Sequence, residues 1–455
     1  MVEKTYQRII QSLGLKVIGS VWLPICLLVN DVFAQEVRLI SDEETEQLLA
    51  KISKPLFKAA GQPLGNREIY IVDDKSLNAF VADGNNLFIN TGTIMTADTP
   101  NELAGVIAHE VGHIAGGHIL RQKLKAKSMQ DISLASAIAA GAAAVFTGNA
   151  DVAMATMLGT QSSIITNFTQ YKTTEERAAD ETALNLLQKT SQSPEGMLKF
   201  MKKLNTINRL QGIEETPYFR THPLTGERIS FFEQAVKNSG IKNSQSLQAE
   251  FELVKAKLKA YLQAPNVTLR EYPTSNNSLP AKYARAIAYF KQLKLSQAKS
   301  EIDYLQQKQP TNPYFYELKG QFFLETGDAD AAKNEYLKAL KYLPNSALLQ
   351  ISLAQAILEA NPSNSDIQHA INLINKAIIK RPTGFAWLLL ARAYGLQGKD
   401  THAYYASAEY STRIGAFEVA ENQLKQALEL NPDKQLKLKI SDLQNKLKKQ
   451  SLNKR

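Results

Sequence analysis

The stretch that decides the fold is His109-Glu110-Val111-Gly112-His113, which has the pattern H-E-x-x-H. Side chains four residues apart lie about 40° apart around a helix, so both histidine rings would point the same way. Neutral imidazoles on one helix face are good zinc ligands, and a glutamate between them can act as a base toward a water molecule. The pattern therefore predicts a catalytic zinc site. The alternative is a core helix whose two histidines are simply hydrogen-bonded.

The residues around this pattern indicate a helix. Thr99 suits the N-cap, Pro100 suits the first helical position, and Glu102 completes a capping box. The apolar residues that follow have the spacing of a buried helix: Leu103, Val106 and Ile107.

His118 needs a separate interpretation. On the same helix it would lie about 180° from His109 and point away from a metal. A metzincin would need its third histidine at position 119, which is Ile119. We therefore interpret His118 as structural or solvent-facing.

A third zinc ligand has to come from elsewhere in the chain, because a catalytic zinc takes three protein ligands and keeps one position open. Glu176 and Asp180 are four residues apart on a predicted helix and share a face. One could bind zinc while the other hydrogen-bonds a ligand histidine. Thr173 and Glu176 also fit a capping box, which would use Glu176 at the helix start instead.

The order of predicted elements indicates an α+β fold that is mainly α. A helix begins at Ser41-Asp42-Glu43-Glu44 and a strand follows at 68–72. Strands at 79–82 and 86–90 flank Asp83-Gly84-Asn85, a hairpin turn, and the H-E-x-x-H helix comes next. The length of 455 residues allows two or three domains.

Residues 1–34 have the features of a secretory signal peptide. Basic residues precede an apolar run from Val17 to Val29, and Val32-Phe33-Ala34 resembles a cleavage site. An uncleaved anchor is the alternative. The single cysteine, Cys26, lies in this segment, so a mature chain would lack thiols, which excludes cysteine catalysis and cysteine zinc ligands.

Residues 132–158 are rich in alanine and carry one charge, Asp151. A membrane span is a poor match because alanine is only weakly apolar and the run is short. The composition favours a buried helical hairpin, or a lid that makes peripheral contact with lipid.

The C-terminal part of the chain is repetitive. Residues 266–280 are predicted to be a linker between a zinc-peptidase domain at 35–265 and a repeat domain at 281–450. Four positions recur 34 residues later: Ala286, Tyr289, Ala298 and Pro310 become Gly320, Phe323, Ala332 and Pro344. This period is typical of tetratricopeptide repeats, so we expect about four helix pairs in an α-solenoid with a concave groove.

The net charge of +9 is partly concentrated near the C-terminus. A solvated helix face explains this excess of lysine, and attraction to an anionic membrane surface or an acidic partner is the alternative. No nucleic-acid-binding motif is present, and a secreted chain would not meet nucleic acid, so no such partner is expected.

Together these features resemble the gluzincin family that includes HtpX and the CAAX prenyl proteases. The shared order is the hairpin at 78–93, the His109–His113 helix, the Glu176–Asp180 pair and a segment that runs from His222 to Arg228 as His-Pro-Leu-Thr-Gly-Glu-Arg. A signal peptide in front and tetratricopeptide repeats behind are similar to the periplasmic BepA-type branch of this family.

The resemblance implies roles for individual residues. His109, His113 and Glu176 would bind one Zn²⁺, Glu110 would be the general base, and Asp180 would support a ligand histidine. His222 would occupy the open zinc position and hold the enzyme off until substrate arrives. Arg228 would lie near that site as a candidate contact to the substrate or the transition state. The segment Asn78-Ala79-Phe80 matches the edge on which the family lays substrate as an added strand.

The same resemblance implies a biological setting. The chain would be a periplasmic endopeptidase that degrades misfolded or stalled outer-membrane proteins or helps to assemble them. The repeat groove would then contact the outer-membrane assembly machinery. The competing hypothesis is a tetratricopeptide chaperone or assembly scaffold whose metal site is largely dormant.

Overall fold

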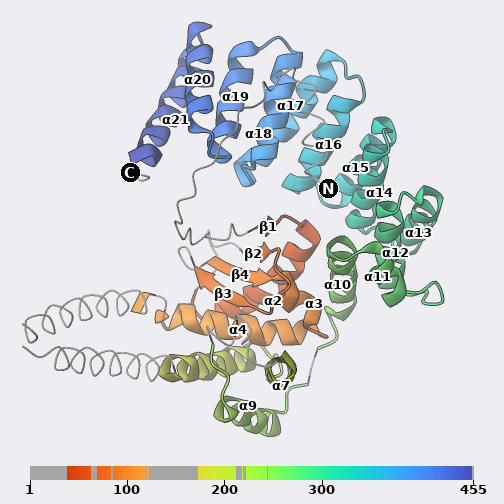
Figure 1. Cartoon of the computed structure of the whole chain (residues 1–455), viewed down its shortest axis with the longest axis vertical. Helices are drawn as coiled ribbons and strands as arrows, with labels where there is room; N and C mark the ends of the chain where they lie inside the picture. The colour runs from red at the N-terminus through yellow and green to blue at the C-terminus, as the bar shows by residue number, and fades with distance from the viewer. Residues whose placement is uncertain are drawn as a thin grey trace, which may run out of the picture. The chain divides into compact units, whose positions relative to one another are not determined.

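A small sheet and the helix that carries the H-E-x-x-H pattern lie together in the computed structural model (Figure 1). The structure describes residues 38–62, 69–82, 86–118, 120–121, 173–211, 218, 222–242 and 244–452. The predicted signal peptide at 1–34, the hairpin turn at 83–85 and the alanine-rich stretch at 132–158 lie outside these residues. Among the residues that are described, no helix is both long and apolar enough to cross a membrane.

The sheet has four strands in the order β1-β2-β4-β3, namely β1 (Leu39–Ile40), β2 (Ile69–Val72), β4 (Asn86–Asn90) and β3 (Ala79–Ala82). β2 and β4 are parallel, whereas β1 pairs with β2 and β3 pairs with β4 in antiparallel fashion. The predicted hairpin is therefore confirmed in its two strands, and β3 forms one edge of the sheet.

Two long helices form the core with this sheet. α2 (Glu43–Ala59) contacts β2, and α4 (Pro100–Ala115) contacts both β3 and α2. Between them, α3 (Thr91–Thr96) follows β4 directly. α4 begins at the predicted residues, because the Thr99 side chain accepts from the Glu102 backbone N–H and Pro100 stands in the first turn. The predicted capping box is wrong in its second half: the Glu102 carboxylate accepts from the Asp98 N–H and pairs with Lys203 instead of returning to Thr99. Every α4 residue before Ala115 is buried, so the H-E-x-x-H residues sit in a rigid element inside the fold.

α4 crosses α7 (Glu195–Gln211) at two glycines. A Cβ on Gly105 would lie 2.7 Å from the Met197 Cα, and a Cβ on Gly196 would overlap the Asn101 carbonyl. The absence of side chains at both positions lets the two helix backbones approach closely. α7 then contacts α9 (Gly226–Asn238), the helix that follows His222.

α10 (Gln248–Leu262) belongs to two hydrophobic cores. One of its faces packs into the core of the sheet and α4 through Phe251, Val254 and Leu258. The other face packs against the first repeat helices through Leu253, Ala256 and Ala260. The helix that precedes the predicted linker thus contributes to both parts of the chain.

The predicted linker at 266–280 contains regular structure. Pro265 starts α11 (Pro265–Glu271), and α12 (Leu279–Lys291) begins with a Ser278 cap. In the segment between these helices, the carbonyls of Pro273 and Asn276 accept from the guanidinium of Arg285, a buried residue of α12, at 2.9 and 2.7 Å. The proline- and asparagine-rich segment is therefore a turn held in place by hydrogen bonds from Arg285.

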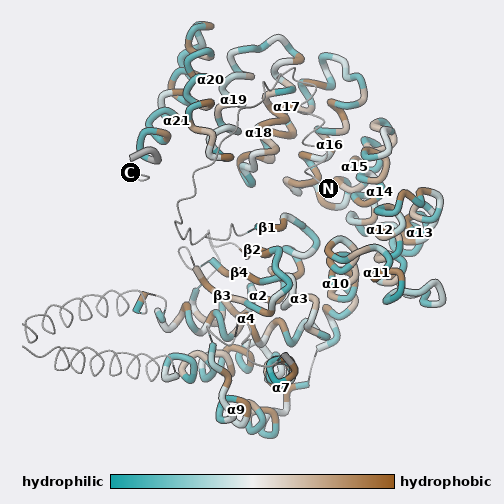
Figure 2. Tube along the Cα trace, in the orientation of Figure 1, coloured by the Kyte–Doolittle hydropathy of each residue, from teal (hydrophilic) through white to brown (hydrophobic). Residues whose placement is uncertain are grey.

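The repeat region is built from paired helices, whose apolar residues alternate with polar ones along each helix (Figure 2). After α12 the described helices are α13 (Leu295–Lys308), α14 (Pro313–Glu325), α15 (Ala329–Tyr342), α16 (Ala347–Glu359), α17 (Asn364–Lys380), α18 (Gly384–Leu396), α19 (Asp400–Arg413), α20 (Phe417–Glu429) and α21 (Lys434–Leu452). The predicted repeats are confirmed as helix pairs, with five pairs in the described residues instead of about four. The last pair consists of α20 and α21, and α21 contains the basic C-terminal segment and buries Leu436, Ile440, Leu443 and Leu447.

The crossing of α4 and α7 gives a testable prediction. In Gly105→Ala the new Cβ would collide with backbone atoms of Met197, which cannot rotate away. We expect a loss of about 1–3 kcal/mol in the free energy of unfolding, measured by urea denaturation. Gly395→Ala is the matched control, because its Cβ would meet nothing within 4 Å. Equal stability of the two variants would show that the helices do not cross at this distance.

Candidate metal centre

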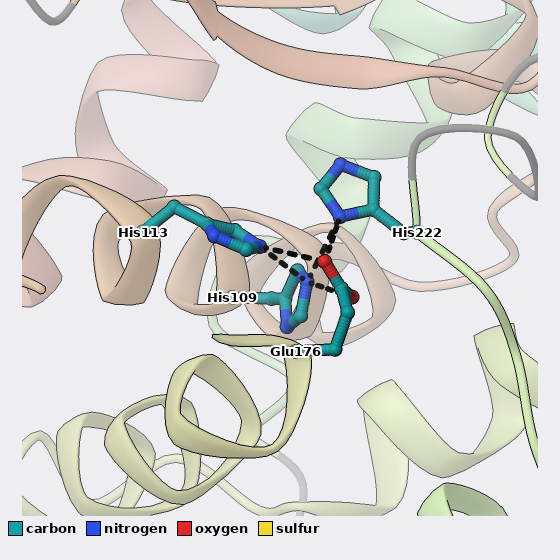
Figure 3. Close-up of side chains that lie close together, drawn as sticks. All are labelled: His109, His113, Glu176 and His222. Carbon is teal, nitrogen blue, oxygen red and sulfur yellow. Dashed lines mark hydrogen bonds and ion pairs between the residues drawn. The ribbon is translucent and has the colours of Figure 1, made fainter. Parts of the chain in front are cut away.

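His109 and His113 point from α4 toward one spot (Figure 3). Their Nε2 atoms lie 3.1 Å apart, and both rings are buried. The two rings therefore converge on one face of α4, as the spacing predicts. The alternative of two separately hydrogen-bonded core histidines does not describe this arrangement, because further ligand-type groups meet the same two nitrogens.

Glu176 comes from the helix at 173–189 and reaches both histidines. Its Oε2 lies 3.2 Å from His109 Nε2, and its Oε1 lies 3.2 Å from His113 Nε2. The two helices can approach because position 112 is glycine: a Cβ there would lie 2.7 Å from the Ala179 carbonyl oxygen. Glu176 is thus turned into the cluster and is not used as a helix cap.

His222 completes a group of four buried side chains. Its Nδ1 lies 2.9 Å from Glu176 Oε1 and 3.3 Å from His109 Nε2. Its other nitrogen, Nε2, lies 3.4 Å from Glu110 Oε1. The His222 ring therefore stands between the ligand cluster and the predicted base.

The donor set fits a zinc ion. Ligand atoms bound tetrahedrally at about 2.0–2.1 Å from zinc lie roughly 3.3 Å apart. The separations of His109 and Glu176 from each other and from the other two side chains run from 2.9 to 3.3 Å, and the four ligand atoms all lie within 4.8 Å of one another. Three imidazoles and one carboxylate are also the ligand types that zinc prefers when cysteine is absent.

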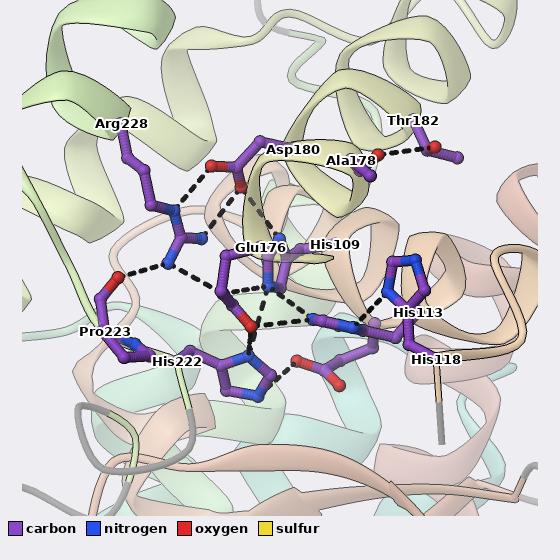
Figure 4. A network of polar contacts seen from close by, with 11 residues as sticks. His109, His113, His118, Glu176, Ala178, Asp180, Thr182, His222, Pro223 and Arg228 are labelled. Carbon is purple, nitrogen blue, oxygen red and sulfur yellow. Dashed lines mark hydrogen bonds and ion pairs between the residues drawn. The ribbon is translucent and has the colours of Figure 1, made fainter. Parts of the chain in front are cut away.

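Asp180 and Arg228 support this cluster from behind (Figure 4). Asp180 Oδ1 lies 2.9 Å from His109 Nδ1, so the carboxylate faces that nitrogen while Nε2 faces the cluster. Arg228 donates to both Asp180 oxygens, at 2.6 and 2.9 Å, and its Nη1 lies 2.8 Å from Glu176 Oε2. One guanidinium thus fixes both carboxylates relative to His109.

Burial and neighbouring charges shift the pKa values of His109 and the groups around it. Burial opposes the charged ring of His109, but the Glu176 and Asp180 carboxylates outweigh it and raise the pKa of His109 to about 9. Burial would raise the pKa of Glu176 as well, yet His109 and the hydrogen-bonding imidazoles hold it well below its usual value. Burial raises the pKa of Glu110 to about 7, although the neighbouring histidines lower it. A carboxyl group with a pKa near neutrality can both accept and return a proton.

His118 was misplaced by the sequence reasoning. The structure buries it against His113, with the two Nδ1 atoms 2.8 Å apart. The extrapolation around one helix failed because α4 ends at Ala115, and Gly117 takes a φ of +65° that turns the chain back. The Gly116-Gly117 pair after H-E-x-x-H was the available signal for this turn.

Tyr218 was also missed, and no local pattern marks it. Its buried ring packs against His222 at a centroid distance of 4.8 Å, and Phe200 contacts it edge-on. Tyr218 thereby holds one side of the His222 ring.

The edge-strand residues divide into two kinds. The Asn78 carbonyl accepts from the Asn90 backbone N–H and its own N–H donates to Thr93, so Asn78 is engaged inside the fold. In an antiparallel pair the backbone groups of alternate residues face the partner strand. The backbone N–H and C=O of Phe80 therefore face β4, and its ring stacks on Phe88 of that strand. The backbone groups of Ala79 and Val81 face the open edge of the sheet instead.

The sequence profile of peptidase family M48 matches residues 43–236. This region is a family M48 peptidase domain. It includes three of the four strands (β2, β3 and β4), α4, Glu176, His222 and Arg228, so the family match and the side-chain cluster coincide. The cluster is also the group of described His, Asp and Glu residues that could hold the metal implied by the family.

Relatives extend the similarity beyond this domain. The chain is 24% identical over 430 residues to the beta-barrel assembly-enhancing protease of Yersinia pestis, covering 91% of this chain and 85% of that protein. The Escherichia coli (strain K12) protein of the same name is also 24% identical, with 91% and 84% covered. Metalloprotease LoiP of Escherichia coli (strain K12) is 28% identical over 182 residues, covering 40% of this chain and 66% of LoiP. The chain is thus a protease, and its similarity to known proteases extends beyond the M48 domain.

The structural comparison with solved proteins gives weaker likenesses. Yeast Tom70 matches with a TM-score of 0.37 at 14% identity, covering 87% of this chain and 75% of Tom70. A tetratricopeptide repeat protein from Parabacteroides merdae matches with a TM-score of 0.29 at 13% identity, covering 53% and 96%. The assignment of repeats rests on the helix pairs themselves.

Asp180 provides the second prediction. In Asp180→Ala, His109 loses the carboxylate that orients it, so we expect metal affinity to fall about 10–100-fold in a chelator competition assay. Asp180→Asn keeps an oxygen acceptor and should lose less. Unchanged metal affinity in Asp180→Ala, with an intact fold by circular dichroism, would remove the orienting role.

Proposed function

We propose that this M48 protease is a zinc-dependent endopeptidase in which His109, His113 and Glu176 bind one Zn²⁺ per chain. The observation that carries the proposal is the convergence of these side chains with Glu110 beside them, all buried. Neither element could form the site alone, because the histidines come from α4 and the glutamate from the helix at 173–189.

Glu110 is the proposed general base. A bound zinc would supply Lewis acidity that polarises the scissile carbonyl and activates the attacking water. Glu110 takes the proton of that water and passes it to the leaving amine. Asp180 and Arg228 keep His109 and Glu176 in place during these proton transfers, and the buried surroundings limit competing water.

Glu110→Gln tests this assignment. Glutamine keeps the shape of the side chain but cannot accept the proton, so we expect normal zinc content and a fall in kcat of about 100- to 10,000-fold. The measurement is cleavage of an unfolded protein substrate together with metal analysis. An unchanged cleavage rate would contradict the role of Glu110.

The same variant separates the two function classes. If the chain works mainly as a tetratricopeptide chaperone or assembly scaffold with a dormant metal site, Glu110→Gln should restore envelope integrity in cells that lack the protein. We expect restoration to fail.

We further propose that His222 is a displaceable fourth ligand. Its ring occupies the space between Glu176 and Glu110, which is where the attacking water has to lie. Substrate binding must then move the His222 segment before cleavage begins. Packing of Tyr218 on the ring stabilises the closed arrangement.

His222→Ala should therefore raise basal cleavage several-fold, because the water position is no longer filled. The assay is the initial rate on an unfolded substrate at saturating zinc. His369→Ala, an exposed repeat residue, is the control and should leave the rate unchanged. A rate in His222→Ala equal to or below wild type would contradict the inhibitory role.

Substrate recognition is proposed to use the edge strand β3. This strand contacts the helix of the metal ligands, and Ala79 and Val81 offer backbone groups at its open edge. Strand addition depends on backbone hydrogen bonds, which suits unfolded segments of many sequences. Asn78 and Phe80 make their contacts inside the fold, so the hydrogen bonds to a substrate strand would be made by the backbone of Ala79 and Val81.

Val81→Pro tests the edge directly. Proline removes an N–H that faces outward and leaves the bonds to β4, so the fold should survive while KM rises about 10-fold or more, roughly the loss of one hydrogen bond in a buried interface. Val81→Ala keeps the N–H and is the matched control. Equal KM values in the two variants would show that substrate does not pair with β3.

The names of the relatives suggest the setting. We propose that the chain acts in the periplasm on misfolded or stalled outer-membrane proteins, and that its repeats contact the outer-membrane assembly machinery. The support is similarity along 91% of the chain to beta-barrel assembly-enhancing proteases, together with a signal-like N-terminus. Residues 132–158 are proposed to make peripheral membrane contact, on composition alone.

A further inference from the structure

Each histidine of the H-E-x-x-H pair uses one ring nitrogen for the cluster and directs the other elsewhere. His109 turns Nδ1 toward Asp180, the carboxylate already described. His113 turns its Nδ1 toward a third imidazole, His118, at 2.8 Å. The two rings meet edge-on, with centroids 4.9 Å apart and an angle of 77° between planes (Figure 4).

The positions of the protons on the two rings determine which histidine donates the hydrogen bond. Two ring nitrogens at this distance form a hydrogen bond only when one carries a proton and the other does not. A neutral imidazole that binds a cation through Nε2 must carry its proton on Nδ1. His113 is therefore the donor and His118 the acceptor, with the remaining His118 proton on Nε2.

The backbone after α4 makes room for this ring. Gly117 turns the chain with its positive φ, so that His118 folds back over the end of the helix. Gly116 has an ordinary φ of −72°, but a Cβ there would overlap the His118 imidazole. Glycine at 116 is thus required by the space that the His118 ring occupies, and glycine at 117 by the backbone conformation. The ring itself is buried.

We propose that His118 is a positioning residue, which accepts the Nδ1 proton of His113 and so fixes the ring and tautomer that present Nε2 to the metal. The inference rests on the proposed metal site. It assigns the two ligand histidines different partners, a carboxylate for His109 and an imidazole for His113. The Gly116-Gly117 turn then belongs to the metal site, since it brings the acceptor into place.

The test compares zinc affinities of the full-length protein by chelator competition. His118→Ala should bind zinc about 10–100-fold more weakly than wild type, as expected when the partner of a ligand histidine is lost. His118→Asn places an amide oxygen close to the position of Nδ1 and should recover much of the affinity. His402→Ala, in α19 of the repeats, is the matched control and should bind zinc as wild type does.

Gly116→Ala provides a second route to the same effect. Its methyl group displaces the His118 ring, so this variant should weaken zinc binding to a similar degree. The double variant Gly116→Ala/His118→Ala should then bind zinc about as tightly as His118→Ala alone, because there is no ring left to displace. Additive losses in the double variant would show that Gly116 acts through backbone packing and not through His118.

The outcomes separate this inference from the proposed function. A wild-type chain that binds no zinc would overturn the metal site itself. A wild-type chain that binds zinc, with His118→Ala equally tight, would overturn only the role of His118. If His118→Ala weakens zinc but His118→Asn does not recover it, the ring acts by filling space and the hydrogen-bond role is wrong. Thermal unfolding in excess chelator checks that the metal-free forms of the variants are equally stable.

Discussion

The close approach of α4 to the helix at 173–189 is the constraint on which the metal centre depends. The two backbones meet at Gly112, where even a methyl group would come within 2.7 Å of the Ala179 carbonyl oxygen. This contact lies between the two ligand histidines on one helix, and between Glu176 and Asp180 on the other. A separation wider by the size of one side chain would remove both carboxylates from hydrogen-bonding distance of His109.

The burial of charged groups in this cluster would be unfavourable in free energy if groups of opposite charge did not lie beside them. Two carboxylates lie beside each other in the interior, and burying either one alone would be strongly unfavourable. Arg228 contacts both of them, and the histidines supply the remaining partners. The supporting residues come from three segments that are far apart in sequence. The cluster is therefore a product of the fold, and a cation bound by His109, His113 and Glu176 would complete the charge balance.

Sequence patterns predicted those parts of the site that depend on local geometry. The spacing of His109 and His113 is a property of one helix, and the Thr99 cap and the β3–β4 strands follow from neighbouring residues. Spacing alone left Glu176 open between a ligand and a cap, and only the resemblance to a family favoured the ligand. The first helix was predicted to begin at the segment from Ser41 to Glu44, and in the structure Asp42 caps it by accepting from the Thr45 N–H. His118 was misplaced because one glycine with positive φ ended the helix, and Tyr218 reaches His222 only through tertiary packing. The predicted linker at 266–280 folded because Arg285 binds its carbonyls from a later helix, which no local pattern could reveal.

The identity and number of the metal ligands provide the most direct test of the proposed site. X-ray absorption spectroscopy at the zinc edge of the purified resting protein reports the ligands directly. We expect one zinc per chain with three imidazole nitrogens and one carboxylate oxygen, which corresponds to His109, His113, His222 and Glu176. A zinc with only two imidazoles would contradict the closed arrangement of His222, and a chain without stoichiometric zinc would contradict the metal centre as a whole.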